Sequence, residues 1–381
     1  MKKVLKITAI ILAMLFVFSA CGPAQVSDDS VDTTDIATDV YIDVLTDAVV
    51  NTDAVESTEK IDGTTEAANS SLVDKKEFKI LMIGNSFCSY FTEELYAIAN
   101  AAGYDITVAN LYESGCPVAD HWKWLNDNSA EYRFYVTSTE YKGVQTQVPS
   151  KNNTTIQYAL DYAKDNLGGD WDVISLQQHF HPGRALNYNV GYGDTSLYAK
   201  LLFNRIGKEH PDTLLLWHET WAYQVGYSVA EYYVGNPNTD TPIPDVATQT
   251  AGYENIKKIC YKIAEENGVD IVPCGDAWQI ARADASVGDT MCARLDNPAV
   301  ALANDNRGDY YHDGDIGGGQ YLNACVWFET LTGTSCVGNT WRPEYKDQNS
   351  KIHTIAEEKI VALQKAAHAA VAAVYGDDYA K

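Results

Sequence analysis

Basic residues are scarce in this sequence. Its 381 residues include 28 Lys and Arg against 52 Asp and Glu, which gives a net charge of −24 at pH 7. Proteins that neutralise nucleic-acid phosphates need clustered Lys and Arg, so this balance argues against a nucleic-acid partner. The same balance argues against electrostatic binding to a membrane surface of anionic lipids. Much of the acid lies in one N-terminal stretch, so the charge says little about a substrate.

Metal-binding spacings are missing as well. No C-x-x-C pair occurs to support structural zinc. A catalytic metal site would have to be built from residues such as His179, His181, His218 and Glu219. No His-x-x-x-His or His-Glu-x-x-His spacing supports one. We therefore expect no metal and no other cofactor.

The N-terminal apolar run, residues 7–18, is too short to span a bilayer. Three Lys precede it, and a basic segment before a short apolar run is typical of a secretory signal. Ser19-Ala20 then lead to Cys21, which resembles the lipobox of bacterial lipoproteins with Phe18 in place of the usual Leu. The resemblance implies cleavage before Cys21 and a lipid on its thiol; the alternative is an ordinary signal peptide with an incidental Cys. We expect an exported protein that is anchored to the outer face of a bacterial cell membrane by this lipid alone.

Seven of the eight cysteines remain when Cys21 is excluded. An odd number outside the cytosol implies at least one free thiol or an intermolecular pair. Cys260, Cys274 and Cys325 lie in apolar patterns, where burial as small hydrophobic residues is the common outcome. The pairing of the remaining thiols stays open, and so does the oligomeric state.

Aromatic and basic residues are nearly absent between Gly22 and about Asp74, where Tyr41 and Lys60 are single examples. Such a segment cannot bury enough apolar surface to offset chain entropy, so we expect it to be disordered. The predicted organisation is a signal peptide with its lipobox at residues 1–21, an acidic linker at 22–75 and one catalytic domain at 76–381.

Short apolar runs alternate with helical patterns through this domain. Strands separated by helices are typical of βαβ units, which predicts an α/β fold. We expect a three-layer α/β/α sandwich, flavodoxin-like, around a mostly parallel five-stranded sheet. Residues 127–153 could form a hairpin, and residues 226–245 are typical of a long surface loop. The expected strands are residues 78–83, 106–111, 171–176, 213–217 and 270–273, and the expected helices lie near residues 91–102, 155–166, 196–210, 247–267, 320–331 and 352–374.

Ser86 follows the first of these strands in the turn Gly84-Asn85-Ser86. Parallel sheets place function at the carboxyl ends of their strands, so a reactive hydroxyl is expected at this position. A plainer interpretation exists. Gly and Asn accept left-handed backbone angles, and Ser is a favoured helix N-cap. The tripeptide alone leaves both interpretations open.

Other chemically distinctive segments occupy similar positions. Residues 112–116 (Tyr-Glu-Ser-Gly-Cys), 177–179 (Gln-Gln-His) and 218–223 (His-Glu-Thr-Trp-Ala-Tyr) each follow a predicted strand, and residues 307–312 (Arg-Gly-Asp-Tyr-Tyr-His) precede a late helix. Together with the Gly-Asn-Ser turn, these blocks resemble the SGNH/GDSL hydrolase superfamily. The resemblance is to an exported bacterial branch that has Gly-Asn-Ser-Phe where Gly-Asp-Ser is usual.

The resemblance implies a catalytic triad, with Ser86 as nucleophile, His312 as general base and Asp309 as the partner of His312. A Ser hydroxyl is a poor nucleophile until an imidazole takes its proton, and an acceptor on the far imidazole nitrogen fixes the tautomer. Asp313 follows His312 where the branch commonly has Leu. It is therefore left open whether Asp309 or Asp313 orients the base.

An oxyanion hole is implied too, from the Ser86 and Gly115 backbone N–H groups and one side-chain amide. The Gly-x-Asn-Asp turn that usually carries this amide is absent, and two Gln residues stand at the strand end. Gln178 is preferred weakly over Gln177 because either amide can donate. Asn85, His179, His218, Glu219 and Trp221 are the residues expected to bind substrate.

The resulting hypothesis is a tethered serine esterase that forms an acyl-enzyme. The resemblance, together with export and the 8 Trp and 25 Tyr, favours O-acyl esters, in particular O-acetyl groups on carbohydrate, over lipids. An acylated glycan is then the expected partner. The alternative is a carbohydrate-binding lipoprotein that has lost turnover on the same fold, because fold alone does not settle activity.

Overall fold

The computed structural model describes residues 72, 75–150, 152–180, 185, 187–225, 245–287, 317–346 and 351–381. The predicted signal peptide, Cys21 and nearly all of the predicted linker lie outside these residues. The export, lipidation and linker assignments therefore stay predictions.

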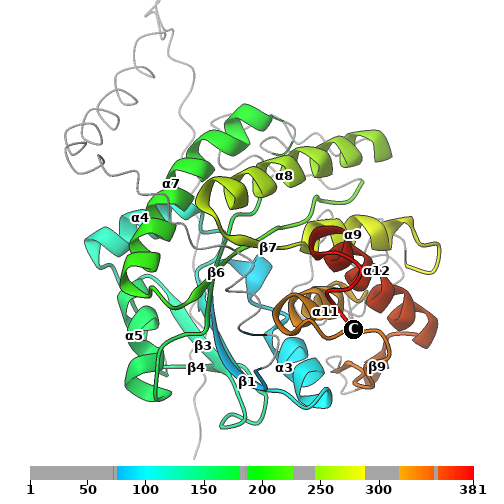
Figure 1. Cartoon of the computed structure of the whole chain (residues 1–381), viewed down its shortest axis with the longest axis horizontal. Coiled ribbons are helices and arrows are strands. Elements are labelled where there is room, and N and C mark those ends of the chain that lie inside the picture. Colours follow the sequence, from blue (N-terminus) through cyan, green and yellow to red (C-terminus); the bar gives the residue numbers. More distant parts are fainter. Residues whose placement is uncertain are drawn as a thin grey trace, which may run out of the picture. The chain divides into compact units, whose positions relative to one another are not determined.

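A seven-stranded sheet forms the centre of the domain, in the order β4-β3-β2-β1-β5-β6-β7 (Figure 1). Five strands are parallel to their neighbours, and these are the five that the sequence predicts. The prediction of five strands in total was wrong, because the segment expected to form a hairpin adds two antiparallel edge strands. The parallel strands are β1 (Glu77–Gly84), β2 (Asp105–Tyr112), β5 (Val173–Gln177), β6 (Leu214–His218) and β7 (Asp270–Val272), and the edge strands are β3 (Arg133–Thr137) and β4 (Thr146–Gln147).

Strand β1 lies at the middle of the sheet and is buried on both faces. Ile80 and Met82 face one apolar cluster, and Leu81 and Ile83 face the other. All four are 0–1% exposed. A continuous apolar run is what a doubly covered parallel strand requires, since successive side chains point to opposite faces.

Helices cover both faces of the sheet, as the three-layer prediction expects (Figure 1). The first apolar cluster joins β1 to four helices, and the second joins it to the other four. The first group is α3 (Thr92–Ala101), α9 (Cys274–Ala283), α11 (Gly319–Thr332) and α12 (Glu357–Tyr375); the second is α4 (Val118–Asp127), α5 (Ile156–Asn166), α7 (Tyr188–Glu209) and α8 (Val246–Asn267).

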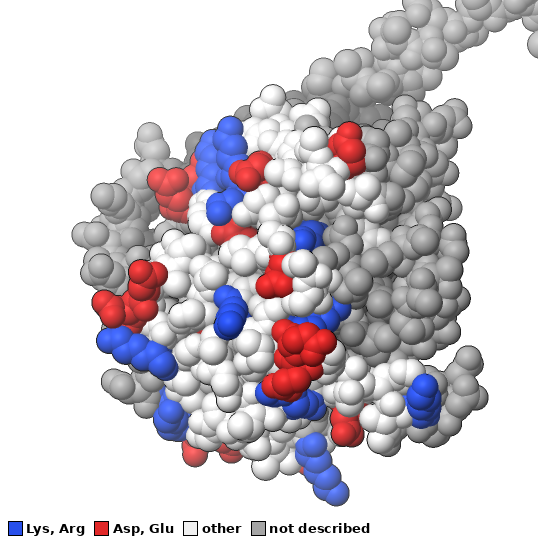
Figure 2. Space-filling model, turned by 90° about the vertical axis from the view of Figure 1, so that its right-hand side faces the viewer, with Lys and Arg blue, Asp and Glu red and all other residues white. Residues whose placement is uncertain are grey.

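The surface of the described residues mixes the two signs of charge. On the face that Figure 2 shows, Lys and Arg side chains lie beside Asp and Glu side chains. Arg342, for example, contacts Glu357 at 2.7 Å. Such exposed pairs contribute little to stability, about 0–1 kcal/mol each. None of the helices within the described ranges is long and apolar enough to cross a bilayer.

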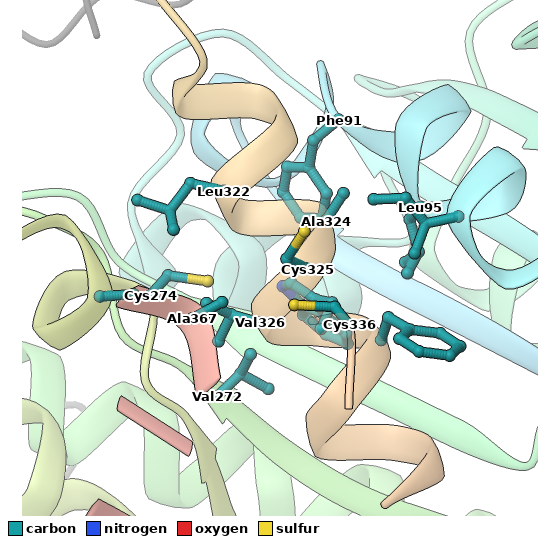
Figure 3. Packing of buried hydrophobic residues seen from close by; sticks show 14 of the residues in the cluster. Phe91, Leu95, Val272, Cys274, Leu322, Ala324, Cys325, Val326, Cys336 and Ala367 are labelled. Atoms are coloured by element: carbon teal, nitrogen blue, oxygen red, sulfur yellow. The ribbon is translucent and has the colours of Figure 1, made fainter. Parts of the chain in front are cut away.

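Helix α11 runs through the middle of the first cluster, and each of its residues is buried. Cys325 and Val326 of this helix lie among Phe91, Cys274 and Cys336 (Figure 3). The six cysteines of the described residues are all buried free thiols. Cys260, Cys274 and Cys325 therefore pack as small hydrophobic residues, as the sequence predicts.

The last predicted helix begins later than expected. Residues Ile352–Thr354 form strand β9, which pairs with β8 (Glu344–Lys346), and α12 starts only at Glu357. Two ten-residue helices, α4 and α9, were not predicted. Each begins directly after a Pro, Pro117 or Pro273, which supplies no side-chain cap.

Candidate active site

The chain leaves β1 at Gly84, and Ser86 starts a short 3-10 helix, η2 (Ser86–Cys88). The residue that caps this helix is Asn85, whose side-chain Oδ1 accepts a hydrogen bond from the Phe87 N–H at 3.1 Å. Ser86 is therefore not the capping residue of the Gly-Asn-Ser turn. Its position beyond a central parallel strand is the one at which α/β folds carry function.

Gly84 is required here by a close approach. A Cβ at this position would lie 2.6 Å from both Cγ and Nε2 of Gln177 and 2.8 Å from the Cys88 Sγ. Gly84 is not among the residues with positive φ, and Asn85 has an extended backbone with φ −124°. Glycine thus allows the Gln177 side chain of β5 to pass against the turn that carries Ser86.

Asn85 connects three strand ends. Its Nδ2 donates to the Cys116 carbonyl at 3.0 Å and lies 2.9 Å from His179 Nδ1. Cys116 belongs to the turn after β2, and His179 to the loop after β5. The side chain next to Ser86 therefore holds two of the predicted blocks at one edge of the sheet.

Gly115 lies in the turn that Asn85 holds. Its φ of +65° is left-handed, as a tight turn at this point requires. The Glu113 N–H donates to the Gly84 carbonyl at 3.3 Å, and the Cys116 N–H donates to the Glu113 carbonyl at 3.3 Å. The first bond continues the pairing of β1 with β2 past the strand ends and the second closes the turn, so together they keep Gly115 beside the Ser86 turn.

Gln178 has a structural task. Its Oε1 accepts from the Val118 N–H at 2.9 Å, and its Nε2 donates to the His179 carbonyl at 2.8 Å. Val118 is the first residue of α4, whose cap residue Pro117 makes no side-chain hydrogen bond. Gln178 therefore caps this helix from another strand end, and both ends of its amide already have protein partners.

Gln177 differs from its neighbour. Its side chain is 1% exposed and lies against Gly84. Neither its oxygen nor its nitrogen has a hydrogen-bond partner within the residues that the structure describes. Leaving a buried amide unpaired costs about 1–3 kcal/mol, so this position is an energetic weak point beside the candidate nucleophile.

His218 lies in the core although it ends strand β6. It is fully buried, with its ring centroid 5.9 Å from that of Phe91 and 5.6 Å from that of Trp327. Burial among uncharged aromatic rings lowers the pKa of His218 to about 3, so the imidazole is neutral at physiological pH. The structure gives this predicted substrate residue a packing environment.

Glu219 is fully buried as well and caps α9. Its Oε2 accepts from the Asp276 N–H, in the first turn of that helix, at 3.0 Å. Burial, followed by the nearby Asp276 carboxylate, raises the pKa of Glu219 well above its ordinary value. Asp276 itself accepts hydrogen bonds from Tyr253, Lys257 and Tyr261. This predicted substrate residue thus belongs to a buried polar cluster that fixes α9.

Trp221 belongs to a chain of aromatic contacts. Its ring centroid lies 4.6 Å from that of Phe87 and 4.6 Å from that of Trp278, and the Phe87 centroid lies 5.7 Å from that of His179. Trp221 and Trp278 are 1% and 0% exposed. Their visible role is to support Phe87, the residue that follows Ser86.

Asp309, His312 and Asp313 lie outside the described residues, as does His181. The pairing of Ser86 with His312 is therefore still a prediction. The described chain resumes at Gly317 and enters α11 through Gly318, where φ is +102° and a Cβ would lie 2.5 Å from Leu363 Cδ1. Across the described ranges, no group of three or more His, Cys, Asp or Glu could hold a metal ion.

The sequence located the strand ends but missed how they are joined. Asn85, which the sequence predicts to bind substrate, links the turns that carry Ser86, Gly115 and His179. The one available signal was the Asn in Gly-Asn-Ser, a side chain that can donate and accept at once.

Comparisons with known proteins agree on the family. A family model described as "Domain of unknown function (DUF4886)" matches residues 79–363. A comparison with curated proteins finds no match. Among solved structures, the chain is similar to a DUF4886 family protein from Bacteroides uniformis. The two share 28% identity and a TM-score of 0.56, over 79% of this chain and 96% of that one.

Two further solved structures are more distant. One, from Parabacteroides merdae, is labelled a GDSL-like lipase and shares 16% identity and a TM-score of 0.36, over 68% of this chain and 97% of that one. The other is a catalytic mutant of an acetylxylan esterase from Geobacillus stearothermophilus, with 13% identity and a TM-score of 0.34, over 67% and 94%. Likeness at this level carries no conclusion about what this chain does. The family model, by contrast, covers most of the sequence, and the chain belongs to the DUF4886 family.

Proposed function

We propose that this chain is a serine esterase that removes O-acyl groups, in particular O-acetyl groups, from carbohydrate at the outer face of a bacterial cell. The observation that carries the proposal is the junction at Asn85. One side chain links the turns after β1, β2 and β5, with Ser86 adjacent to it. This is the arrangement that an acyl-transfer site needs, because nucleophile and oxyanion donors must lie around one reacting atom.

The proposed reaction has two steps. The Ser86 hydroxyl attacks the acyl carbonyl while His312 takes its proton, and Asp309 accepts from the far nitrogen of His312 to fix the tautomer. His312 then protonates the departing sugar oxygen, which leaves an acyl-Ser86. Water, activated by the same imidazole, releases the acid and restores Ser86. Asp313 is the alternative partner of His312.

Charge develops on the carbonyl oxygen in each step. The Ser86 N–H and the Gly115 N–H are the backbone donors proposed for it. The support for Gly115 is the held turn, whose ends are bonded to Gly84 and Asn85. Donors fixed before the reaction need no reorganisation during it, which is why each is typically worth a hundredfold or more in rate.

The choice of a glycan ester rests on export and on the chemistry of the chain. The predicted signal and lipobox are the basis for proposing a location outside the cell, with acylated polysaccharide as the proposed substrate. A lipase would need a broad exposed apolar entry, and the strongly acidic sequence does not indicate one.

The test is covalent labelling of Ser86. We expect a fluorophosphonate to label the wild-type chain stoichiometrically and Ser86→Ala not at all. Ser89→Ala is a matched control, because Ser89 is a buried hydroxyl three residues away at the end of η2, and this variant should label as the wild type does. Hydrolysis assays with p-nitrophenyl acetate and a panel of acetylated glycans then identify which acyl group the chain removes and from which alcohol.

Two outcomes would contradict the proposal. Labelling that persists in Ser86→Ala would place the reactive residue elsewhere. A wild-type chain that neither labels nor hydrolyses any ester, yet binds the glycans, would identify a binding module on the same fold.

A further inference from the structure

Resting on the proposed function, we infer that His179 supplies the side-chain donor of the oxyanion hole, through its Nε2–H. The inference begins with the orientation of Asn85. Its Oδ1 accepts from the Phe87 N–H at 3.1 Å, so its Nδ2 is the atom that faces the Cys116 carbonyl and His179. An amide NH₂ group only donates.

The tautomer of His179 follows from that orientation. Asn85 Nδ2 lies 2.9 Å from His179 Nδ1, so Nδ1 must accept. A neutral imidazole that accepts at Nδ1 carries its proton on Nε2. The ring is thus fixed as a donor at Nε2. In this form Nε2 cannot remove a proton from Ser86, so His179 does not compete with His312 for the role of base.

The location of the ring suits a donor to the reacting carbonyl. His179 is bonded to the side chain of Asn85 and stacked on Phe87, with centroids 5.7 Å apart and ring planes at 23°. It therefore contacts the residues on both sides of Ser86. A group bound for the Ser86 hydroxyl would arrive beside this ring.

The ring is also held firmly, as a preorganised donor must be. The His179 carbonyl accepts from Gln178 Nε2 at 2.8 Å, and the Gln178 carbonyl accepts from Thr220 Oγ1 at 2.8 Å. Its ring stacks on Phe87, Phe87 in turn contacts Trp221, and Trp221 stacks on Trp278.

The two Gln residues are less suitable. The amide of Gln178 caps α4 at one end and bonds the His179 carbonyl at the other, so its use would uncap the helix. Gln177 lies with its Cγ and Nε2 closely against Gly84, at 1% exposure. Of these three side chains, His179 is the one that combines a fixed N–H with contacts to both neighbours of Ser86.

Two isosteric variants separate the roles of the ring nitrogens. The amide nitrogen of Gln extends about as far from the backbone as Nε2, and the amide of Asn about as far as Nδ1. His179→Gln keeps a donor at the Nε2 position and loses the ring. His179→Asn keeps an acceptor for Asn85 and loses the donor. With p-nitrophenyl acetate, we expect His179→Asn to lower kcat by about a hundredfold or more with KM little changed, and His179→Gln to stay within about tenfold of wild type.

A purely structural role predicts the opposite order, because Asn preserves the bond to Asn85 and Gln does not. Kinetics in which His179→Asn equals or exceeds His179→Gln would overturn the inference. Loss of kcat in Gln177→Met without loss in His179→Asn would also overturn it, by assigning the donor to Gln177. Both results leave the esterase proposal intact. A wild-type chain without ester turnover overturns both proposals.

A structure of the wild-type chain with a fluorophosphonate on Ser86 tests the same point without variants that could fail to fold. The phosphonyl oxygen is then a stand-in for the oxyanion. We expect it about 2.7–3.1 Å from His179 Nε2. An oxygen bonded instead to Gln177 Nε2, or to backbone N–H groups alone, would contradict the inference.

Discussion

Gly84, Asn85 and Ser86 form one short motif, but the three residues have three different tasks. Gly84 leaves room for the Gln177 side chain, because a Cβ would lie 2.6 Å from it. Asn85 caps η2 through its Oδ1 and joins the strand ends through its Nδ2. Ser86 is then placed by its two neighbours, so replacing either of them should move the hydroxyl even where the core stays intact.

His218 gives a prediction about pH at the scale of one residue. Its folded-state pKa is about 3, against 6.5 for an ordinary His. As pH falls below 6.5, the unfolded chain binds a proton that the folded chain cannot accept until about pH 3. Folding stability should therefore be complete above pH 6.5 and be lost through this window, at most by about 1.4 kcal/mol per pH unit.

His218→Phe removes this contribution, because Phe keeps a ring among Phe91, Trp221 and Trp327 and does not titrate. We expect the difference in unfolding free energy between this variant and the wild type to shift in favour of the variant as pH falls from 7 to 4. Urea unfolding at several pH values measures it. A difference that does not change with pH would show that the pKa of His218 is the same in the folded and the unfolded chain.

Sequence reasoning at this scale could find Ser86 but not the environment of the other residues. Ser86 follows a recognisable buried strand. His218 ends a strand and Glu219 and Trp221 follow it, and nothing local distinguishes an exposed strand end from a covered one. Whether they face solvent or the core depends on Phe91, Trp327 and α9, which pack against them from distant parts of the chain.

At the scale of elements, two helices are capped by residues from other strands. Val118 of α4 donates to Gln178, and Asp276 of α9 donates to Glu219. The first N–H groups of a helix need acceptors, and neither Pro117 nor Pro273 offers a side chain for them. The loops after β5 and β6 are in this way tied to the helices beside the site.

Gln178→Met tests the cap of α4. Met has a similar shape and no acceptor, so the Val118 N–H loses its partner and we expect a loss of about 1–3 kcal/mol in unfolding free energy. Gln177→Met is the matched control. Its amide has no partner within the described residues, so the same change there should be neutral or stabilising.

Urea unfolding of the two variants decides between these expectations. Equal losses would mean that packing volume, not hydrogen bonding, determines the stability of this loop. A larger loss at Gln177 would reverse the assignment and point to a partner for that amide.

The positions of the parallel strands could be predicted because the signal for each one, an apolar run, lies within its own sequence. The five parallel strands were found, since a strand buried on both faces reads as an uninterrupted apolar stretch. Helices α4 and α9 were missed because their start signals lie outside their own sequence, in Gln178 and Glu219. The start of α12 was misplaced because residues 352–354 pair with β8, a contact that periodicity does not encode.

At the scale of the whole molecule, the α/β order alone predicted that distant blocks would meet. Strands β1, β2, β5 and β6 are neighbours and parallel, so their carboxyl ends share one edge. The structure confirms this layering, and the bonds of Asn85 confirm the meeting of the first three blocks. The number of strands was not predictable, because β3 depends on pairing with β2 and the short edge strand β4 depends on pairing with β3.

Contacts with the folded domain also include Leu72, a residue of the predicted linker. Leu72 is 2% exposed and belongs to the apolar cluster that β1 shares with α3, α11 and α12. The Leu72 carbonyl accepts from the Lys75 N–H at 2.9 Å, and Lys75 Nζ lies 2.9 Å from Asp172. A boundary at residue 76 would remove all three contacts from the domain.

Truncation measures what this anchor contributes. We expect a chain that begins at residue 76 to be less stable than one that begins at residue 70 by about 1.5–3 kcal/mol, the usual value of burying one Leu side chain. The exposed Lys75–Asp172 pair should add little to that difference. Leu72→Ala in the longer chain should therefore reproduce most of the loss, whereas Lys75→Ala should not. Equal unfolding free energies for the two truncated chains would show that the domain is complete without Leu72, and that the linker begins where composition places it.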